Sequence, residues 1–417
     1  MKIKSLSLRN IGPFIKADME FLADTDQKPR IVLITGENGS GKSIILDAIR
    51  GMFGHQFCEL ERKIRRSQSN GKSDITLVLE KNGETVPLLF AEFHDKWIEL
   101  FPTEGHYEQI SNIPKQIQEG DHYPNWIADY WASGLASGSY KIDSLNKLQH
   151  KNFLINALQG KKKSSDITQI ICHFDYLRDS RNQNEQETGE RLYEILEKII
   201  EKALSDGGRL SHVSRATYEP VIIQNSQPVL LENLSGGNLY LIQNMVSLLG
   251  KMYSVHLLRQ APISELCRTP GLLLIDEAEN HLHPKWQKRL FTTILDSFPN
   301  LQIIATTHSP FIISSVPNAR LFVCKSRNDH CIVVDETSEY TNKPVDEILM
   351  SPLFEETLPF NEEISLLIKK REQAILSCNQ ADREQIETEL KAINPEYFSY
   401  FDTDRLLEEI VGKESAT

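Results

Sequence analysis

The segment Gly36–Ser43, GENGSGKS, concentrates residues that could bind phosphate. It fills the pattern G-x-x-x-x-G-K-[ST], in which glycines let backbone N–H groups turn inward around phosphate oxygens. In this pattern the lysine reaches the β- and γ-phosphates, and the serine hydroxyl binds Mg²⁺. We therefore expect a nucleotide to be held by Gly36, Asn38, Gly39, Ser40, Gly41, Lys42 and Ser43.

Two later segments offer groups that such a loop needs. GLLLIDEAENHLHP is an apolar run that ends in Asp276 and Glu277. The first carboxylate is placed to hold Mg²⁺ and the second to polarise an attacking water. LQIIATTHSP puts His308 just past another apolar run, where it could donate to the γ-phosphate. Each signal is weak alone, so the assignment depends on their sharing a site with the loop.

Buried strands must position these groups. The runs RIVLI before the loop, GLLLI before Asp276 and LQIIAT before His308 are typical of strands buried on both faces of a sheet. SIILDAIRGMF after the loop has helical spacing, so the positive end of a helix faces the phosphates. The predicted fold class is α/β, with a P-loop in a mixed or parallel core sheet.

The rest of the sequence predicts further strands, hairpins and helices. KIKSLSLRN and KADMEFL are predicted to form strands, and hairpins are expected across Asn82–Gly83, across Asn225–Gln227 and around Asn328–Asp329. Long helices are expected in ETGERLYEILEKIIEKAL and SGGNLYLIQNMVSLLGKMYSVHLL, and one helix is expected to run from Pro284 through WQKRLFTTILDSF. Two short amphipathic helices are expected around Ala381–Asp382.

Four segments follow from this pattern. Residues 1–95 are predicted to form an N-terminal antiparallel β lobe that carries the phosphate loop. Residues 96–215 are predicted to form a mostly helical insertion, and residues 216–335 a second lobe that carries LSGGN, Asp276, Glu277 and His308. Residues 336–417 read as a helical C-terminal extension.

Composition excludes several classes of protein. No apolar run reaches the roughly 18 residues that a membrane span needs, and the first residues lack a signal-peptide block, so we expect a cytoplasmic protein. The six cysteines form no pair or cluster at metal spacing, which predicts reduced thiols and no zinc site. The net charge of -12 argues against a generally basic surface. Two local basic patches could still bind nucleic acid: Arg62, Arg65 and Arg66, and Lys161, Lys162 and Lys163.

In chain order the sequence runs phosphate loop, LSGGN at Leu234–Asn238, the Asp276–Glu277 pair and His308. This ordered set resembles the ABC-type ATPase heads, which include transporter domains, SMC and RecF heads and OLD-like defence ATPases. The resemblance covers about residues 1–323. It implies ATP and Mg²⁺ as cofactors, with Asp276 as the Walker B aspartate, Glu277 as the catalytic glutamate and His308 as the switch histidine.

The same resemblance gives LSGGN a role in another molecule's site. It implies that Ser235, Gly236 and Gly237 complete the ATP site of a second copy, so at least a homodimer is expected. NHLH at Asn280–His283 occupies the D-loop position. IDEAENHLHP and ATTHSP look like the OLD-like and defence branch. The tail from Val345 resembles that of the ATPase subunits of Septu-type and retron-associated anti-phage systems, which implies an effector partner such as a nuclease.

The sequence departs from the family pattern in two places. No Q-loop glutamine stands in residues 128–134, ADYWASG, where it is expected. Asp402 and Asp404 form a D-x-D, but we expect a solvated acidic tail there and no nuclease domain after it.

Four functional classes are therefore compared. The favoured one is an ATPase whose oligomer regulates a separate effector in anti-phage defence. The alternative is a RecF/SMC-like repair or recombination ATPase that acts directly on DNA, with a basic channel and steep salt dependence. A nucleotide-gated scaffold without turnover fits poorly because Glu277 and His308 are present, and a transporter subunit fits least.

Overall fold

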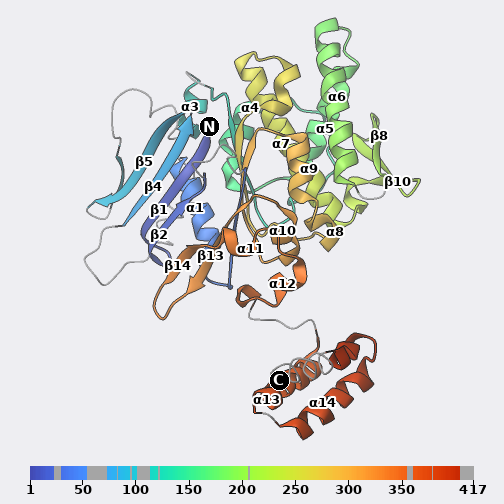
Figure 1. Cartoon of the computed structure of the whole chain (residues 1–417). Coiled ribbons are helices and arrows are strands. Elements are labelled where there is room, and N and C mark those ends of the chain that lie inside the picture. Colours follow the sequence, from blue (N-terminus) through green and yellow to red (C-terminus); the bar gives the residue numbers. More distant parts are fainter. Residues whose placement is uncertain are drawn as a thin grey trace. The chain divides into compact units, whose positions relative to one another are not determined.

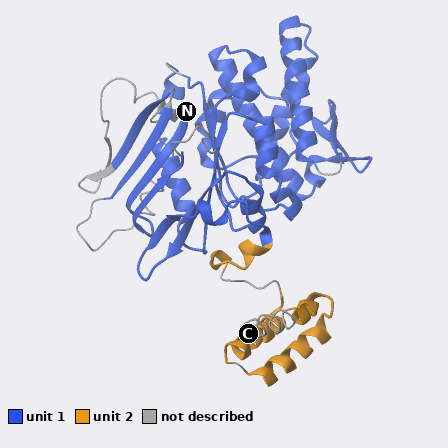
Figure 2. Cartoon of the chain, in the orientation of Figure 1, with its two compact units in different colours: residues 1–345 blue, residues 346–417 orange. Residues whose placement is uncertain are grey.

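The computed structural model describes residues 1–22, 30–53, 73–81, 83–93, 96–100, 113–120, 123–204, 207–354, 360–377 and 379–403. The chain forms two compact units, Met1–Val345 and Asp346–Thr417 (Figure 2). The first unit contains all of the site residues expected from the sequence. The second lies within the segment 336–417 expected to be an extension. No helix among the described residues is long and apolar enough to cross a membrane.

The first unit is built on a mixed sheet with strand order β6-β5-β4-β1-β2-β14-β13-β3-β12-β11-β7. Figure 1 labels its strands β5, β4, β1, β2, β14 and β13. Its strands are β1 (Lys2–Ile11), β2 (Phe14–Glu20), β3 (Ile31–Gly36), β4 (Asp74–Lys81), β5 (Glu84–Phe93), β6 (Lys96–Leu100), β7 (Ile127–Trp131), β11 (Gly271–Ile275), β12 (Leu301–Thr306), β13 (Arg320–Ser326) and β14 (Cys331–Asp335).

The parallel half of this sheet positions the polar residues picked out from the sequence. Strands β13, β3, β12, β11 and β7 lie side by side and run parallel. All residues of β3, β11 and β12 are buried, as their continuous apolar runs predict. Because Thr306 pairs with Ile34 and Ile275 with both Ala305 and Trp131, the carboxyl ends of these strands meet at one edge.

The expected hairpins are present. β4 and β5 pair in antiparallel register up to Lys81 and Glu84, and β13 pairs with β14. A separate small sheet has the order β10-β9-β8, from β8 (Arg209–Ser214), β9 (Glu219–Gln224) and β10 (Gln227–Leu230). Asn225 and Ser226 connect β9 to β10 with φ values of 51° and 61°, the positive values that a two-residue turn between twisted strands requires.

The first unit also contains a set of helices that cover its strands (Figure 1). They are α1 (Lys42–Met52), α3 (Ile113–Glu119), α4 (His150–Ile155), α5 (Ser164–Arg178), α6 (Gln183–Ala203), α7 (Gly236–Arg259), α8 (Pro284–Gln287), α9 (Leu290–Ser297), α10 (Pro310–Ser315), α11 (Thr337–Tyr340) and, at the boundary, α12 (Val345–Leu349). Short 3₁₀ turns cover Ala157–Gln159, Leu231–Asn233 and Ile263–Arg268. Helix α7 packs against α4, α5, α6 and β7.

One predicted helix is divided. The helix expected to run on from Pro284 forms α8 and then α9. At the junction the N–H of Arg289 donates to Trp286 O at 3.0 Å, a bond to the third preceding residue that interrupts the α-helical ladder. Residues 96–215, expected to be mainly helical, contain α3 to α6 and also supply β6 and β7 to the main sheet and β8 to the small one.

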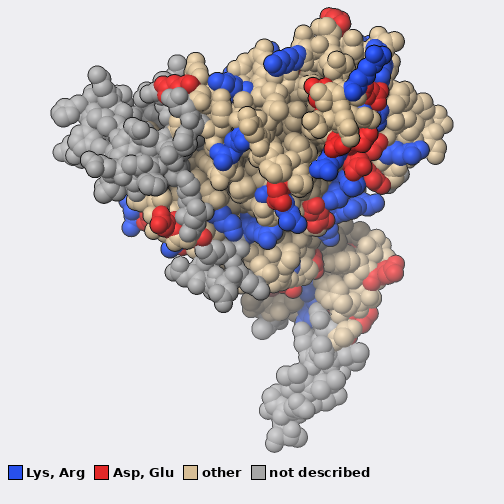
Figure 3. Space-filling view, turned by 90° about the horizontal axis from the view of Figure 1, so that it is seen from above, with Lys and Arg blue, Asp and Glu red and all other residues tan. Residues whose placement is uncertain are grey.

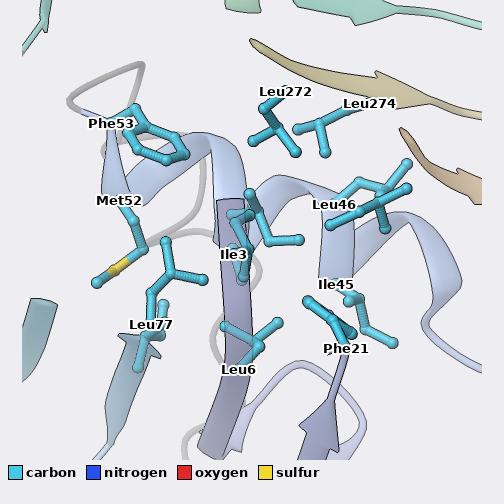
Figure 4. Close-up of a cluster of buried hydrophobic side chains, with 14 of the residues drawn as sticks. Ile3, Leu6, Phe21, Ile45, Leu46, Met52, Phe53, Leu77, Leu272 and Leu274 are labelled. Carbon is cyan, nitrogen blue, oxygen red and sulfur yellow. The ribbon is translucent and has the colours of Figure 1, made fainter. Parts of the chain in front are cut away.

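Helix α1 packs against strands of both halves of the sheet: β3 and β12 of the parallel half, and β4 of the antiparallel half. Its Ile45 and Leu46 join buried side chains from β1, β4 and β11 (Figure 4). Each such Leu or Ile contributes about 1.5–3 kcal/mol relative to an exposed one. Because α1 begins at Lys42, this core also fixes the end of the phosphate loop.

The second unit is a helical hairpin. Helices α13 (Glu362–Leu376) and α14 (Gln380–Ile393) pack together, and 3₁₀ turns cover Pro352–Phe354 and Tyr397–Ser399. Its small core consists of Leu367, Leu390, Phe398 and Phe401. The pair of short helices expected around Ala381–Asp382 is confirmed.

Candidate functional site: a phosphate loop beside two carboxylates

The phosphate loop has the backbone conformation that its glycines allow. Gly36 has φ 135° and Gly41 has φ 94°, values that other residues rarely adopt. A Cβ on Gly36 would lie 2.2 Å from Cys324 O, and one on Gly41 would lie 2.5 Å from the Pro13 ring. Both positions therefore require glycine, both for backbone conformation and for space.

The lysine of the loop is folded back onto its backbone. Lys42 Nζ donates to Gly36 O at 3.0 Å and to Glu37 O at 2.8 Å. Burial lowers the pKa of Lys42, while the charges of Cys324, Glu279, Asp276 and Glu277 act in the opposite direction. Residues Glu37, Asn38 and Gly39 are exposed at the top of the loop, whereas Ser40 is buried. The ammonium group is thus held among carbonyls at the base of an open loop.

Asp276 lies at the centre of a cluster of hydroxyl groups. Its Oδ1 accepts from Ser43 Oγ at 3.0 Å and from Thr306 Oγ1 at 2.6 Å, and its Oδ2 accepts from Tyr130 OH at 3.3 Å. The structure thus brings the loop serine and the β11 carboxylate together, as the sequence predicts. Oxygen ligands from one carboxylate and one hydroxyl suit Mg²⁺, which is bound in phosphate sites by one or two carboxylates.

Glu277 is held in a left-handed conformation just after β11. Its φ is 51°, uncommon for a residue other than glycine and often found at functional sites. Its N–H donates to Thr306 Oγ1 at 2.8 Å, and its Oε2 accepts from Asn280 Nδ2 at 2.5 Å. Thr306 therefore contacts both carboxylate residues of the pair, and Asn280 fixes the Glu277 side chain.

Glu279 fixes the segment that carries His308. Its Oε1 accepts from the His308 N–H at 2.8 Å, and its Oε2 accepts from Thr307 Oγ1 at 2.7 Å. Burial lowers the pKa of His308, and the neighbouring charge of Lys42 lowers it further, against the opposite effect of the carboxylates. The net shift favours the neutral imidazole, a form that can donate one hydrogen bond.

The signature segment is exposed at the start of α7. Ser235 caps α7 by accepting from Asn238 N at 3.4 Å, and Ser235 and Gly236 are exposed. A Cβ on Gly236 would meet open space, whereas one on Gly237 would lie 2.7 Å from His281 O. The described contacts of this segment are thus with the D-loop of the same chain, and its outer side is exposed to solvent.

The D-loop residues are fixed by polar contacts. His281 Nε2 lies 3.1 Å from Ser133 O, and its ring is 5.8 Å from that of Tyr240 in α7. His283 caps α8, where its Nδ1 accepts from Lys285 N at 3.3 Å.

Sequence reasoning missed three residues of this site. Tyr130, Thr306 and Glu279 all make side-chain bonds to the predicted residues or their backbone. The sequence ATTH, which places two threonines at the end of β12 just before His308, could have pointed to Thr306. Tyr130 lies in ADYWASG, the segment expected to carry a Q-loop glutamine, and that segment forms β7 and the turn after it.

The two basic patches have different outcomes. Arg62, Arg65 and Arg66 lie outside the described residues. Lys161 and Lys163 are exposed, but Lys162 Nζ donates to Asn244 of α7 and lies 5.4 Å from the centre of the Trp131 ring. Acidic and basic side chains are interspersed on the face in Figure 3. Asp402 pairs with Lys391 at 2.5 Å, and Asp404 lies outside the described residues.

Fold and site together define an α/β P-loop ATPase head, with the loop lysine and serine beside a carboxylate pair on a parallel sheet. A model of the family described as "AAA domain, putative AbiEii toxin, Type IV TA system" matches residues 31–314, and the chain belongs to this family. A second AAA domain model matches residues 1–57.

Relatives point to the same class. The chain is 26% identical to the "Retron Vc95 probable ATPase" of Vibrio cholerae, over 89% of this chain and 84% of that one. It is 23% identical to the "Septu protein PtuA" of Bacillus thuringiensis, over 75% and 73% of the two chains. The SMC head domain from Thermotoga maritima is 17% identical, with a TM-score of 0.46 over 80% of this chain and 99% of that one. The protein is an ATPase, and its relatives include ATPases of retron and Septu systems. The strand order of its main sheet confirms the expected α/β fold class.

Proposed function

We propose that the protein is an ATPase that binds Mg²⁺-ATP, assembles at least as a dimer when ATP is bound, and regulates a partner effector, such as a nuclease, in anti-phage defence. The single observation that carries this proposal is the cluster formed by Ser43, Asp276 and Thr306 beside Glu277. It joins the phosphate loop to the residues that hydrolysis requires.

Each residue has a proposed task in hydrolysis. Lys42, together with the backbone N–H groups of the phosphate loop, binds the phosphates, and Ser43 and Asp276 hold Mg²⁺, which would neutralise charge on the β- and γ-phosphates. Glu277 orients and polarises the attacking water, and Asn280 keeps its carboxylate in place. Neutral His308 donates to the γ-phosphate, where negative charge develops.

The exposed signature segment supports a composite site. A capped helix N-terminus with an open Gly236 presents N–H groups outward, an arrangement that attracts phosphate. Because its described contacts are with the D-loop, we propose that Ser235, Gly236 and Gly237 bind the γ-phosphate held by a second copy. ATP then stabilises the dimer, because only the γ-phosphate adds this contact.

The Glu277→Gln variant tests hydrolysis and assembly together. It keeps the size and the contact with Asn280 but loses the charge that polarises water, so turnover should fall at least a hundredfold while ATP binding is retained. Light scattering after gel filtration should give a doubled mass with ATP and a monomer with ADP. A variant that turns over ATP at the wild-type rate would exclude Glu277 as the catalytic carboxylate.

The proposed effector is tested by purification from the native host. Co-purification of a nuclease, or of a reverse transcriptase with its DNA, would support the hypothesis of a role in anti-phage defence. Direct action on DNA is the alternative. Of the basic-patch residues that the structure describes, Lys161 and Lys163 are exposed and are the candidates for contacting DNA. Salt-dependent DNA binding that falls in the Lys161→Ala/Lys163→Ala double variant would favour that alternative.

A further inference from the structure

Strand β7 brings a phenol to the carboxylate of the proposed metal site. Tyr130 is 7% exposed, and its OH donates to Asp276 Oδ2 at 3.3 Å. Ser43 and Thr306 both bond to the other oxygen, Oδ1. Among the described residues, Tyr130 is the one whose side-chain bond reaches Oδ2. Donors on both oxygens restrict the rotation of the carboxylate about its Cβ–Cγ bond.

The Tyr130 ring is itself held by two contacts. The Arg50 guanidinium lies 3.9 Å from the ring centre, and Arg50 Nε donates to Leu158 O at 2.7 Å. A Cβ on Gly160 would lie 2.7 Å from the ring carbons, so the bare backbone of this residue packs against the ring. Arg50 belongs to α1, the helix that begins at Lys42. The phenol is therefore held by elements that also support the phosphate loop.

The neighbouring residue on the opposite side of β7 anchors the strand. Asp129 pairs with Lys251 of α7 at 2.5 Å and accepts from Trp131 Nε1 at 3.1 Å. Adjacent residues of a strand point to opposite faces, so Asp129 contacts the signature helix while Tyr130 contacts the Walker B carboxylate. Edge strand β7 is thereby tied to α7 on one face and to the nucleotide site on the other.

We propose that Tyr130 is a positioning residue that orients Asp276 for Mg²⁺. The inference deepens the proposed function, because it rests on Ser43 and Asp276 being the metal ligands. Tyrosine supplies this contact from the segment in which the sequence lacks a glutamine. Removing the hydroxyl should weaken nucleotide binding in the presence of Mg²⁺ and leave the nucleotide affinity without metal unchanged.

The test measures binding, without turnover. A fluorescent, non-hydrolysable ATP analogue is titrated in EDTA and then at increasing Mg²⁺ concentration, with wild type, Tyr130→Phe and Tyr193→Phe. Tyr193 is a matched control, because it is also buried and has the Arg178 guanidinium 3.9 Å from its ring centre, but it lies in α6. Urea unfolding of the three proteins checks that each is folded.

For Tyr130→Phe we expect the half-saturating Mg²⁺ concentration to rise about threefold to tenfold, with unchanged affinity in EDTA. The expected effect is smaller than for a short bond to a carboxylate, because this bond is long at 3.3 Å. Tyr193→Phe should match the wild type. An unchanged Mg²⁺ midpoint in Tyr130→Phe, or an equal loss of affinity in EDTA, would overturn the inference. Wild-type binding that does not depend on Mg²⁺ at all would instead refute the proposed metal site.

Discussion

Thr306 is the best place to test whether the two carboxylates work as one unit. Its hydroxyl donates to Asp276 Oδ1 at 2.6 Å and accepts from the Glu277 N–H at 2.8 Å. Thr306→Val replaces this hydroxyl with a methyl group of similar size at the end of a fully buried strand. The substitution thus removes both bonds and leaves both carboxylate side chains in the protein.

The contacts set the expected magnitude. Asp276 keeps Ser43 and Tyr130 as donors, so the loss on that side is one hydrogen bond to a charged group, worth about 1.5–3 kcal/mol. If this energy holds the two carboxylates in place in the transition state, kcat should fall about 10- to 100-fold. The Glu277 N–H loses its acceptor as well, so the free energy of unfolding should fall by about 1–3 kcal/mol.

Steady-state ATPase assays and urea unfolding measure the two effects separately. Thr168→Val is the matched control, because Thr168 is also fully buried and donates to Tyr140 O at 2.6 Å, but in α5. Both variants should lose stability, whereas only Thr306→Val should lose kcat per folded molecule. Equal kcat values in the two variants would refute the idea that Thr306 positions the carboxylates.

Three further predictions concern binding, packing and pH. Lys42→Ala should abolish ATP binding in a fluorescence titration, and unchanged affinity would refute the phosphate-loop assignment. Asp129→Asn should lower the free energy of unfolding by about 3–5 kcal/mol, because the 7% exposed side chain of Lys251 would lose its partner. The double variant Asp129→Leu/Lys251→Met should recover most of that loss, and a single variant as stable as wild type would contradict the buried pair. Burial and the neighbouring His150 lower the pKa of His173 to about 4. Because the unfolded chain takes up this proton at a higher pH than the folded chain does, the free energy of unfolding should fall as the pH drops from 6.5 to about 4. His173→Gln should reduce that fall by up to about 3 kcal/mol in urea unfolding, and an unchanged pH profile would contradict it.

The elements that carry the site could be predicted because their signals are local. The apolar runs of β3, β11 and β12 are continuous, and the polar residue that follows each run is next to it in sequence. The signature helix was also predicted, since Ser235 precedes a long apolar helix and accepts the bond expected of an N-cap.

The residues that the sequence did not predict depend on which strands are neighbours. Tyr130 reaches Asp276 because β7 pairs with β11, and no periodicity shows that these distant segments are adjacent. Lys162 looked like part of a basic surface, but packing of its loop against α7 turns its ammonium toward Asn244. The divided helix after Pro284 likewise depends on a bond at Arg289 that helical spacing does not show.

Mixing two inactive variants tests the central claim, a shared ATP site, most directly. Lys42→Ala removes the phosphate contact, and Ser235→Arg blocks the exposed signature segment, so each variant alone should have no ATPase activity. In a symmetric dimer, each mixed pair keeps one intact composite site, so an equimolar mixture should regain about a quarter of wild-type activity. Full activity of Ser235→Arg alone, or no recovery on mixing the folded variants, would contradict a site shared between two chains.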